Sequence, residues 1–275
     1  MLNPEQGNNI IKNWLLRDRT FACSRIGIGG ESFSCYEHDK FGKISERTSY
    51  WLRNIAGFYG KDSDISFFVD EYKKGISCAE LQVVWNVTFL NEVENYLHTT
   101  YSKNSLKIHH RSIEPFYFDN PWSEALEGKK VLVVHPFSDT IISQYKKKNN
   151  LFKTNVLPKF DLTVIKSPQS LAGNKPHSSW KESYEITKNQ INGIDFDVAL
   201  LGCGSYGLPL VNHIRTELNR TAIYIGGALQ IMFGIMGKRW DEMKEISSMY
   251  NKHWVRPSKE EVPQNYQIVE NGSYW

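Results

Sequence analysis

The second half of the chain alternates short apolar runs with helix-like segments, and this alternation constrains the fold more than any other feature. A continuous apolar run such as KKVLVVHPF, from residue 129, is typical of a strand buried on both faces, which is a property of parallel sheets. Further strand-like runs lie at 160–170, 196–207 and 221–234, and helical patterns at 142–152, 179–194 and 208–218. The pattern predicts an α/β fold: a Rossmann-like, mostly parallel sheet with helices on both faces.

The first half of the chain is more mixed, and we interpret it as part of the same single domain of residues 1–275. A capping pattern beginning at Asn3 opens a helix. The strand-like runs lie at 20–30 and 79–87, and the helix-like runs at 45–59, 65–76 and 91–101. The segment 118–129 is the best candidate for a seam before the Rossmann-like part. From Trp254 onward apolar clusters are few, which predicts an irregular tail.

Composition excludes several classes of function. The net charge is only +3, from 33 basic and 30 acidic residues, and this balance argues against a nucleic-acid partner, which would need clustered basic charge. No window reaches 18 uninterrupted apolar residues, so we expect no transmembrane segment. The N-terminal residues lack the pattern of a signal peptide, and the four cysteines show no C-x-x-C pair. We therefore expect a cytoplasmic protein, with any membrane contact peripheral at the inner face.

Polar or glycine-rich residues follow each predicted strand of the second half. Because ligands of open parallel sheets bind beyond the carboxyl ends of the strands, we expect the turns that follow these strands, here called corners, to form one crevice. Glycine turns that lead into helices offer amide N–H groups to phosphate, although any tight turn also needs glycine. The candidate residues for binding such a phosphate-bearing ligand are His135, Gln169, Gly202, Gly204, Ser205, Tyr206, Gly207, Gly226, Gly227, Gln230 and Arg239.

The stretch SRIGIGGES, residues 24–32, is a second candidate site. Arg25 and Glu31 flank its glycines at a strand exit. A carboxylate there could act as a general base or hold a divalent metal, and the alternative is that Glu31 only occupies the first turn of the next helix, near its positive end. Arg25, Lys238 or Arg239 could neutralise phosphate charge.

Aromatic residues near the strand ends add a further expectation. Trp85 and Trp240 could stack on a sugar or a base. Cys203, between two glycines, is either a nucleophile or a buried thiol, and the second case is commoner.

Three familiar motifs do not fit. GCGSYG matches G-x-G-x-x-G, but no acidic residue follows at the required spacing, which makes an NAD-linked oxidoreductase the weaker interpretation. The phosphate-binding motif G-x-x-x-x-G-K-[ST] is absent. Ser205 lacks the G-x-S-x-G context of α/β-hydrolases, because Cys203 stands two residues before it.

Four longer stretches carry a family resemblance. They are PWSEALEGKKVLVVHPFSDTIISQY, LPKFDLTVIKSPQSLAG, IDFDVALLGCGSYGLPLVNHI and IGGALQIMFGIMGKRW. They resemble a family of bacterial proteins found among polysaccharide-biosynthesis genes, over about Ser24 to Trp240, and that family is similar to the GT-D class of glycosyltransferases. The resemblance implies a Rossmann-like sheet that binds a nucleotide-sugar, with Mn²⁺ or Mg²⁺ held on a D-x-E motif near the first strand.

This chain departs from the D-x-E motif. Glu31 matches the Glu, whereas Gly29 or Ile28 occupies the Asp position. By the resemblance, Glu31 would then be the base for the acceptor hydroxyl, or would hold the metal through water.

The resulting expectation is a glycosyltransferase that moves a sugar from a nucleotide-sugar donor to a glycan or a glycosylated, lipid-linked carrier in capsule, other surface polysaccharide or glycoprotein synthesis. The alternative is a non-catalytic module of a polysaccharide assembly system that binds a nucleotide or sugar phosphate. Such a module would use the same glycine turns without needing Glu31.

Overall fold

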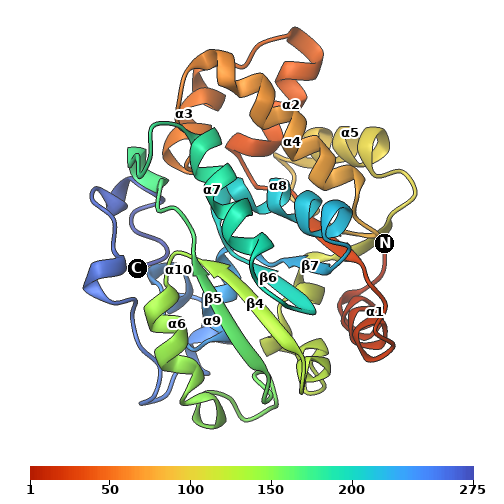
Figure 1. Ribbon diagram of the computed structural model, residues 1–275, viewed down its shortest axis with the longest axis vertical. Coiled ribbons are helices and arrows are strands. Elements are labelled where there is room, and N and C mark those ends of the chain that lie inside the picture. The colour runs from red at the N-terminus through yellow and green to blue at the C-terminus, as the bar shows by residue number, and fades with distance from the viewer.

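The computed structural model describes residues 1–275 and contains one seven-stranded sheet in which every pairing is parallel. The strands are β1 Ala22–Arg25, β2 Leu81–Val84, β3 Leu106–His109, β4 Lys130–His135, β5 Asp161–Lys166, β6 Val198–Leu201 and β7 Thr221–Tyr224. Their order across the sheet is β3-β2-β1-β7-β6-β4-β5. The predicted α/β, Rossmann-like fold is confirmed, and the sheet is parallel throughout rather than mostly parallel (Figure 1).

The path of the chain brings its two halves together at the centre of the sheet. The first three strands run outward from β1 to the β3 edge, and the later strands end with β7 beside β1. Ala22 pairs with Ala222 and Cys23 with Ile223, two hundred residues apart. The direction of the connections reverses between β4, which leads outward to β5, and β6, which leads the opposite way to β7, so a crevice is expected beyond the carboxyl ends of β4 and β6.

Helices cover both faces of the sheet (Figure 1). One layer holds α2 Gly30–Phe41, α3 Glu46–Asn54, α4 Ile65–Ser77, α5 Asn91–Tyr101, α7 Trp180–Asn192 and α8 Gly207–Asn212. The other holds α1 Pro4–Leu16, α6 Ser138–Tyr145, α9 Leu229–Met232, α10 Lys238–Asp241 and α11 Lys244–Ser247. No helix combines the length and the apolar character that crossing a bilayer requires.

The alternation of side chains along the strands explains why both faces are covered. In β4, Val131 and Val133 pack into one hydrophobic cluster, and Leu132 and Val134 into the other. Each cluster contains 33 buried residues, so neither face of the central strands meets water. Such a strand reads as a continuous apolar run, which is why KKVLVVH was recognisable in the sequence.

Several predicted boundaries are wrong. The helix predicted at 142–152 is α6, which begins at Ser138 and ends at Tyr145, and a separate 3-10 turn follows at Lys148–Asn150. The strand predicted over 221–234 ends at Tyr224, because Gly226 adopts a positive φ of 72° that turns the chain. Strand β3 was not predicted.

The predicted seam at 118–129 and the predicted irregular tail beyond Trp254 both contain only short 3-10 turns. Residues 118–129 hold a 3-10 turn, Trp122–Leu126, which packs on α1 and leads the chain from the β3 half of the sheet to β4. Beyond Trp254 the tail contains only two short 3-10 turns, Lys259–Glu261 and Tyr266–Ile268, and is otherwise irregular, as predicted.

The two outer edges of the sheet are protected in different ways. At β3, the N–H of Leu2 donates to the carbonyl of Lys107 at 2.7 Å, and the N–H of His109 donates to the carbonyl of Leu2 at 3.2 Å. At β5, Asp161 and Lys166 are exposed at the two ends of the strand. Paired backbone at one edge and charge at the other both discourage contact with further strands.

Candidate functional site

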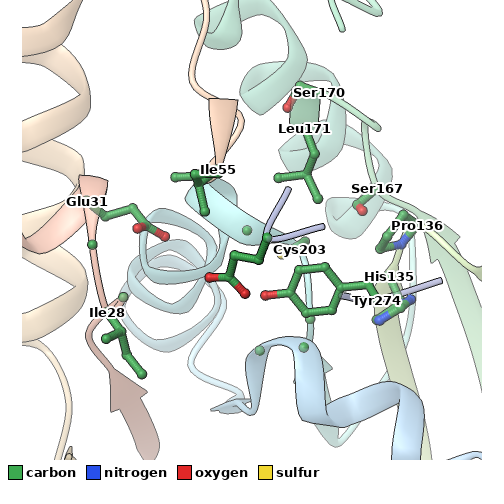
Figure 2. A pocket seen from close by; sticks show the side chains of 18 of the residues that line it. Ile28, Glu31, Ile55, His135, Pro136, Ser167, Ser170, Leu171, Cys203 and Tyr274 are labelled. Carbon is green, nitrogen blue, oxygen red and sulfur yellow. The ribbon is translucent and has the colours of Figure 1, made fainter. Parts of the chain in front are cut away.

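A cavity of about 320 Å³ lies beyond the carboxyl ends of five parallel strands, β1, β7, β6, β4 and β5 (Figure 2). This is the edge at which the sequence predicted a crevice. Most of the predicted site residues line it: Arg25, Glu31, His135, Gln169, Gly202, Gly204, Gly226, Gly227, Gln230 and Arg239. The topology therefore brings residues from both halves of the chain around one space.

Three predicted donor-binding residues do not line the cavity, and their surroundings show why. Ser205 and Tyr206 are buried behind it, where the indole N–H of Trp180 donates to Ser205 Oγ at 2.8 Å and the Trp180 and Tyr206 rings stack at 5.2 Å. Gly207 is covered by the ring of Tyr224. A strand-to-helix corner has two sides, and these residues face the helix layer rather than the ligand side.

The glycine corners of β6 and β7 lie against each other at the base of the cavity. A Cβ on Gly202 would stand 2.7 Å from His135 Cδ2 and 2.8 Å from the carbonyl oxygen of Gly226, so only glycine fits there. Gly204 and Gly226 have positive φ angles of 57° and 72° and begin 3-10 turns. As first residues of these turns, their N–H groups lack a partner within the turn and can receive an acceptor from a ligand.

His135, the last residue of β4, forms a neutral wall of the cavity. Its Nδ1 accepts the N–H of Phe137 at 3.0 Å, which places the ring proton on Nε2. Burial lowers the pKa of His135 to about 3, because the imidazolium would lose its hydration. The ring therefore offers an uncharged N–H donor at neutral pH.

The corner after β5 contributes polar groups. Gln169 is half buried, and its Nε2 is buried without a hydrogen-bond partner. Ser170, beside it, shares a hydrogen bond of 3.1 Å with the hydroxyl of Tyr206. An unpaired buried donor is costly, so an acceptor atom on a bound ligand would satisfy Gln169.

Glu31 lies in the first turn of α2 and is 9% exposed. Its carboxyl group bends over Gly27, where a Cβ would meet Oε2 at 2.4 Å, and Figure 2 shows it directed into the cavity. Burial raises its pKa, while its own backbone N–H and the Arg25 guanidinium oppose that rise. The result is a buried carboxyl group with an elevated proton affinity at the cavity wall.

Arg25 ends β1 and bridges the two halves of the sheet. Its Nη1 donates to the carbonyl of Ile225, and its guanidinium carbon lies 4.4 Å from the centroid of the Trp85 ring. The Trp85 indole N–H donates to the carbonyl of Ile26 at 2.8 Å. Trp85 does not line the cavity, so it is not placed to stack on a ligand there, and its ring supports Arg25 instead.

The C-terminal tail supplies one wall that the sequence did not predict, made by Glu270, Tyr274 and Trp275. The ring of Tyr274 covers Gly227, where a Cβ would stand 2.3 Å from Tyr274 Cε1. Gln230, through Nε2, donates to the carbonyl of Tyr274 at 3.0 Å. Its amide therefore holds the tail, although Gln230 also lines the cavity as predicted.

Two other predicted contacts also belong to the tail. The Trp240 and Tyr274 ring centroids lie 6.0 Å apart, and Lys238 donates through Nζ to the carbonyl of Asn271 at 3.1 Å. Neither Trp240 nor Lys238 lines the cavity, so neither is placed to meet a ligand there. Arg239 does line it and pairs with Glu270.

Apolar side chains complete the opposite rim. Ile28 follows β1 and Phe89 follows β2, and both line the cavity although they are 39% and 61% exposed. Ile28 lies within the predicted stretch 24–32, whereas Phe89 was not predicted, because an isolated apolar residue in a loop carries no periodicity.

The chemistry of the remaining groups is limited. Cys203 lines the cavity, but burial raises the pKa of its thiol, which keeps it protonated and a poor nucleophile. No group of three His, Cys, Asp or Glu residues is arranged to hold a metal ion.

No protein-family model, curated protein or solved structure matches this chain. The family resemblance stated from the sequence motifs stays a prediction.

Proposed function

We propose that the protein is a glycosyltransferase that moves a sugar from a nucleotide-sugar to a hydroxyl group of a glycan or of a glycosylated, lipid-linked carrier in bacterial surface polysaccharide or glycoprotein synthesis. One observation carries the proposal. The buried carboxyl group of Glu31 shares a cavity with the glycine corners of β6 and β7 and with two arginines, Arg25 and Arg239.

The glycine corners supply the support for a donor diphosphate. The N–H groups of Gly204 and Gly226 are not used within their turns, and the absence of side chains lets a phosphate approach the backbone. Arg25 and Arg239 provide positive charge on two sides. Donors that are already oriented stabilise the charge that develops on a leaving diphosphate.

Glu31 is the proposed general base. The acceptor oxygen attacks the anomeric carbon of the donor sugar, the bond from that carbon to the phosphate oxygen breaks, and the acceptor proton passes to Glu31 as the nucleoside diphosphate leaves. A carboxylate with an ordinary pKa is a weak base at neutral pH, and burial raises the pKa of Glu31 in the useful direction. His135 and Gln169 would orient the donor through their N–H groups.

A divalent cation stays a prediction. The residues offer a single carboxylate from the α2 turn, since Gly29 or Ile28 occupies the Asp position of the D-x-E motif, and no cluster of three ligands accompanies Glu31. Such a set does not make a metal site of protein atoms alone, so no step of the proposed reaction is assigned to a metal.

The test compares wild type with Glu31→Gln, which preserves the shape of the side chain and removes its basicity. Nucleotide-sugars are screened by thermal shift, with and without Mn²⁺, and hits are assayed for donor turnover with and without acceptor glycans. We expect Glu31→Gln to retain donor binding and lose about 10²- to 10⁴-fold in turnover. Glu46→Gln, an exposed carboxylate outside the cavity, is the matched control.

Two outcomes would contradict this assignment. Unchanged turnover in Glu31→Gln would exclude Glu31 as the base. Tight donor binding by the wild type, with no turnover under any condition, would support the non-catalytic binding module instead.

A further inference from the structure

The tail segment Glu270–Gly272 has an unusual backbone. Glu270, Asn271 and Gly272 have consecutive positive φ angles of 47°, 57° and 82°. Glycine adopts this region freely, whereas a glutamate there is uncommon and strained. Residues in such conformations persist when their surroundings hold them, and they cluster at ligand sites and switch segments.

Contacts on the cavity side hold this turn. Glu270 pairs with Arg239, and both side chains line the cavity with exposed fractions of 49% and 35%. The Arg239 guanidinium carbon lies 4.8 Å from the centroid of the Tyr274 ring, and the Arg239 N–H donates to the carbonyl of Ser273 at 2.9 Å. The carboxylate of Glu270 thus occupies the anion-binding face of a cavity arginine.

A second glutamate of the tail behaves differently. Glu261 is 3% exposed, and its carboxylate accepts the N–H of Asp139 at 2.8 Å and that of Thr140 at 3.3 Å, at the start of α6. Charge at a helix N-terminus and full burial make Glu261 a permanent anchor. The tail is therefore fixed at Glu261, and at Glu270 it is held by a half-exposed ion pair across a strained turn.

We propose that Glu270 takes, in the free protein, the place on Arg239 that a phosphate of the donor occupies when bound, so that donor binding displaces Glu270 and rearranges residues 270–272. This inference rests on the proposed function, since it assigns a charge-selecting residue to the same cavity. A carboxylate and a phosphate present the same pair of acceptor oxygens to a guanidinium, and the phosphate carries more charge. A neutral ligand cannot make this exchange, so the contact selects for anionic ligands.

The proposal predicts that removing the competing charge tightens anion binding. Half-exposed ion pairs contribute little, which corresponds to about a two- to fivefold gain in affinity for Glu270→Gln. Arg239→Gln should bind more weakly than wild type. In the double variant Glu270→Gln/Arg239→Gln, the gain should vanish, because Glu270 then has no arginine to block.

Isothermal titration with ADP, GDP, CDP, UDP and inorganic pyrophosphate measures these affinities at one ionic strength. Glu260→Gln is the matched control: it removes the same charge from an exposed position in the same tail. Hydrogen exchange gives a second measurement, because the N–H groups of Gly272 and Ser273 both donate to the carbonyl of Val269. Nucleotide binding should speed exchange at these two amides in the wild type.

Glu270→Gln binding no more tightly than Glu260→Gln, or unchanged exchange at Gly272 and Ser273 on nucleotide binding, would overturn the proposal. So would the absence of binding by every variant. Tighter binding by Glu270→Gln without sugar transfer by any protein would leave this inference standing and refute glycosyl transfer, which is measured separately through Glu31.

Discussion

His135 should make the stability of the protein depend on pH in a way that a single substitution removes. The pKa of this histidine is about 3 in the folded protein, against 6.5 for the free side chain. As the pH falls below 6.5, the unfolded chain takes up a proton that the folded chain refuses, so protonation favours unfolding. The wild type therefore loses stability from pH 6.5 downward, until His135 protonates in the folded state near pH 3.

The size of the effect follows from these two pKa values. Between pH 7.5 and pH 5, this group alone should lower the free energy of unfolding by about 2 kcal/mol. His135→Asn removes the titration, and the Asn side-chain oxygen can still accept the N–H of Phe137. Other histidines titrate equally in both proteins and cancel in the difference.

The assay is urea unfolding of wild type and His135→Asn at intervals from pH 8.5 to pH 5, above the range of general acid unfolding. The difference in free energy of unfolding should be constant from pH 8.5 to pH 7.5, where His135 is neutral in both states. It should then move by about 2 kcal/mol in favour of the variant by pH 5. A difference that stays constant over the whole range would refute the claim that His135 is held neutral by burial.

Two further substitutions test the base of the cavity. Gly202→Ala should lose about 1–3 kcal/mol of stability and also lose nucleotide affinity, because its Cβ would stand 2.8 Å from the backbone oxygen of Gly226. Urea unfolding measures the stability, and nucleotide titration measures the affinity. If both values equal those of the wild type, this packing argument is wrong. Trp180→Phe should lose about 1–3 kcal/mol through the missing hydrogen bond to Ser205 Oγ, with nucleotide affinity retained since Trp180 does not line the cavity. If Trp180→Phe is fully folded under the assay conditions and still binds nucleotide more weakly than the wild type, Ser205 contributes to ligand binding, contrary to this argument.

The sequence predicts those elements of the fold whose apolar residues follow a regular local pattern. Strand β4 is buried on both faces, so its apolar run is continuous and recognisable. Strand β3 is short, and three of its four residues are at least partly exposed, so LKIH carries no such pattern. Strand β3 forms because all four of its residues pair with β2, and a sequence pattern within β3 does not reveal this long-range contact.

The candidate site was predictable as far as topology alone determines it. The carboxyl ends of parallel strands meet at one edge, which places Gly202, Gly226 and His135 together whatever the side-chain details. Tertiary contacts decide which residues of a corner face the cavity. Ser205 does not face it, because its Oγ accepts the indole N–H of Trp180 on α7. The tail residues could not be predicted, because Glu270 reaches the cavity through an irregular backbone without a repeat.

The pairing of Leu2 with β3 has a consequence for handling the protein. Leu2 exchanges two backbone hydrogen bonds with this strand, donating to Lys107 and accepting from His109. A fusion partner or a cleavage that pulls Leu2 away would bare a row of hydrogen-bonding groups along the outermost strand. Such a row is a template for another molecule, so self-association and precipitation, rather than unfolding, would be the first sign of damage at that end.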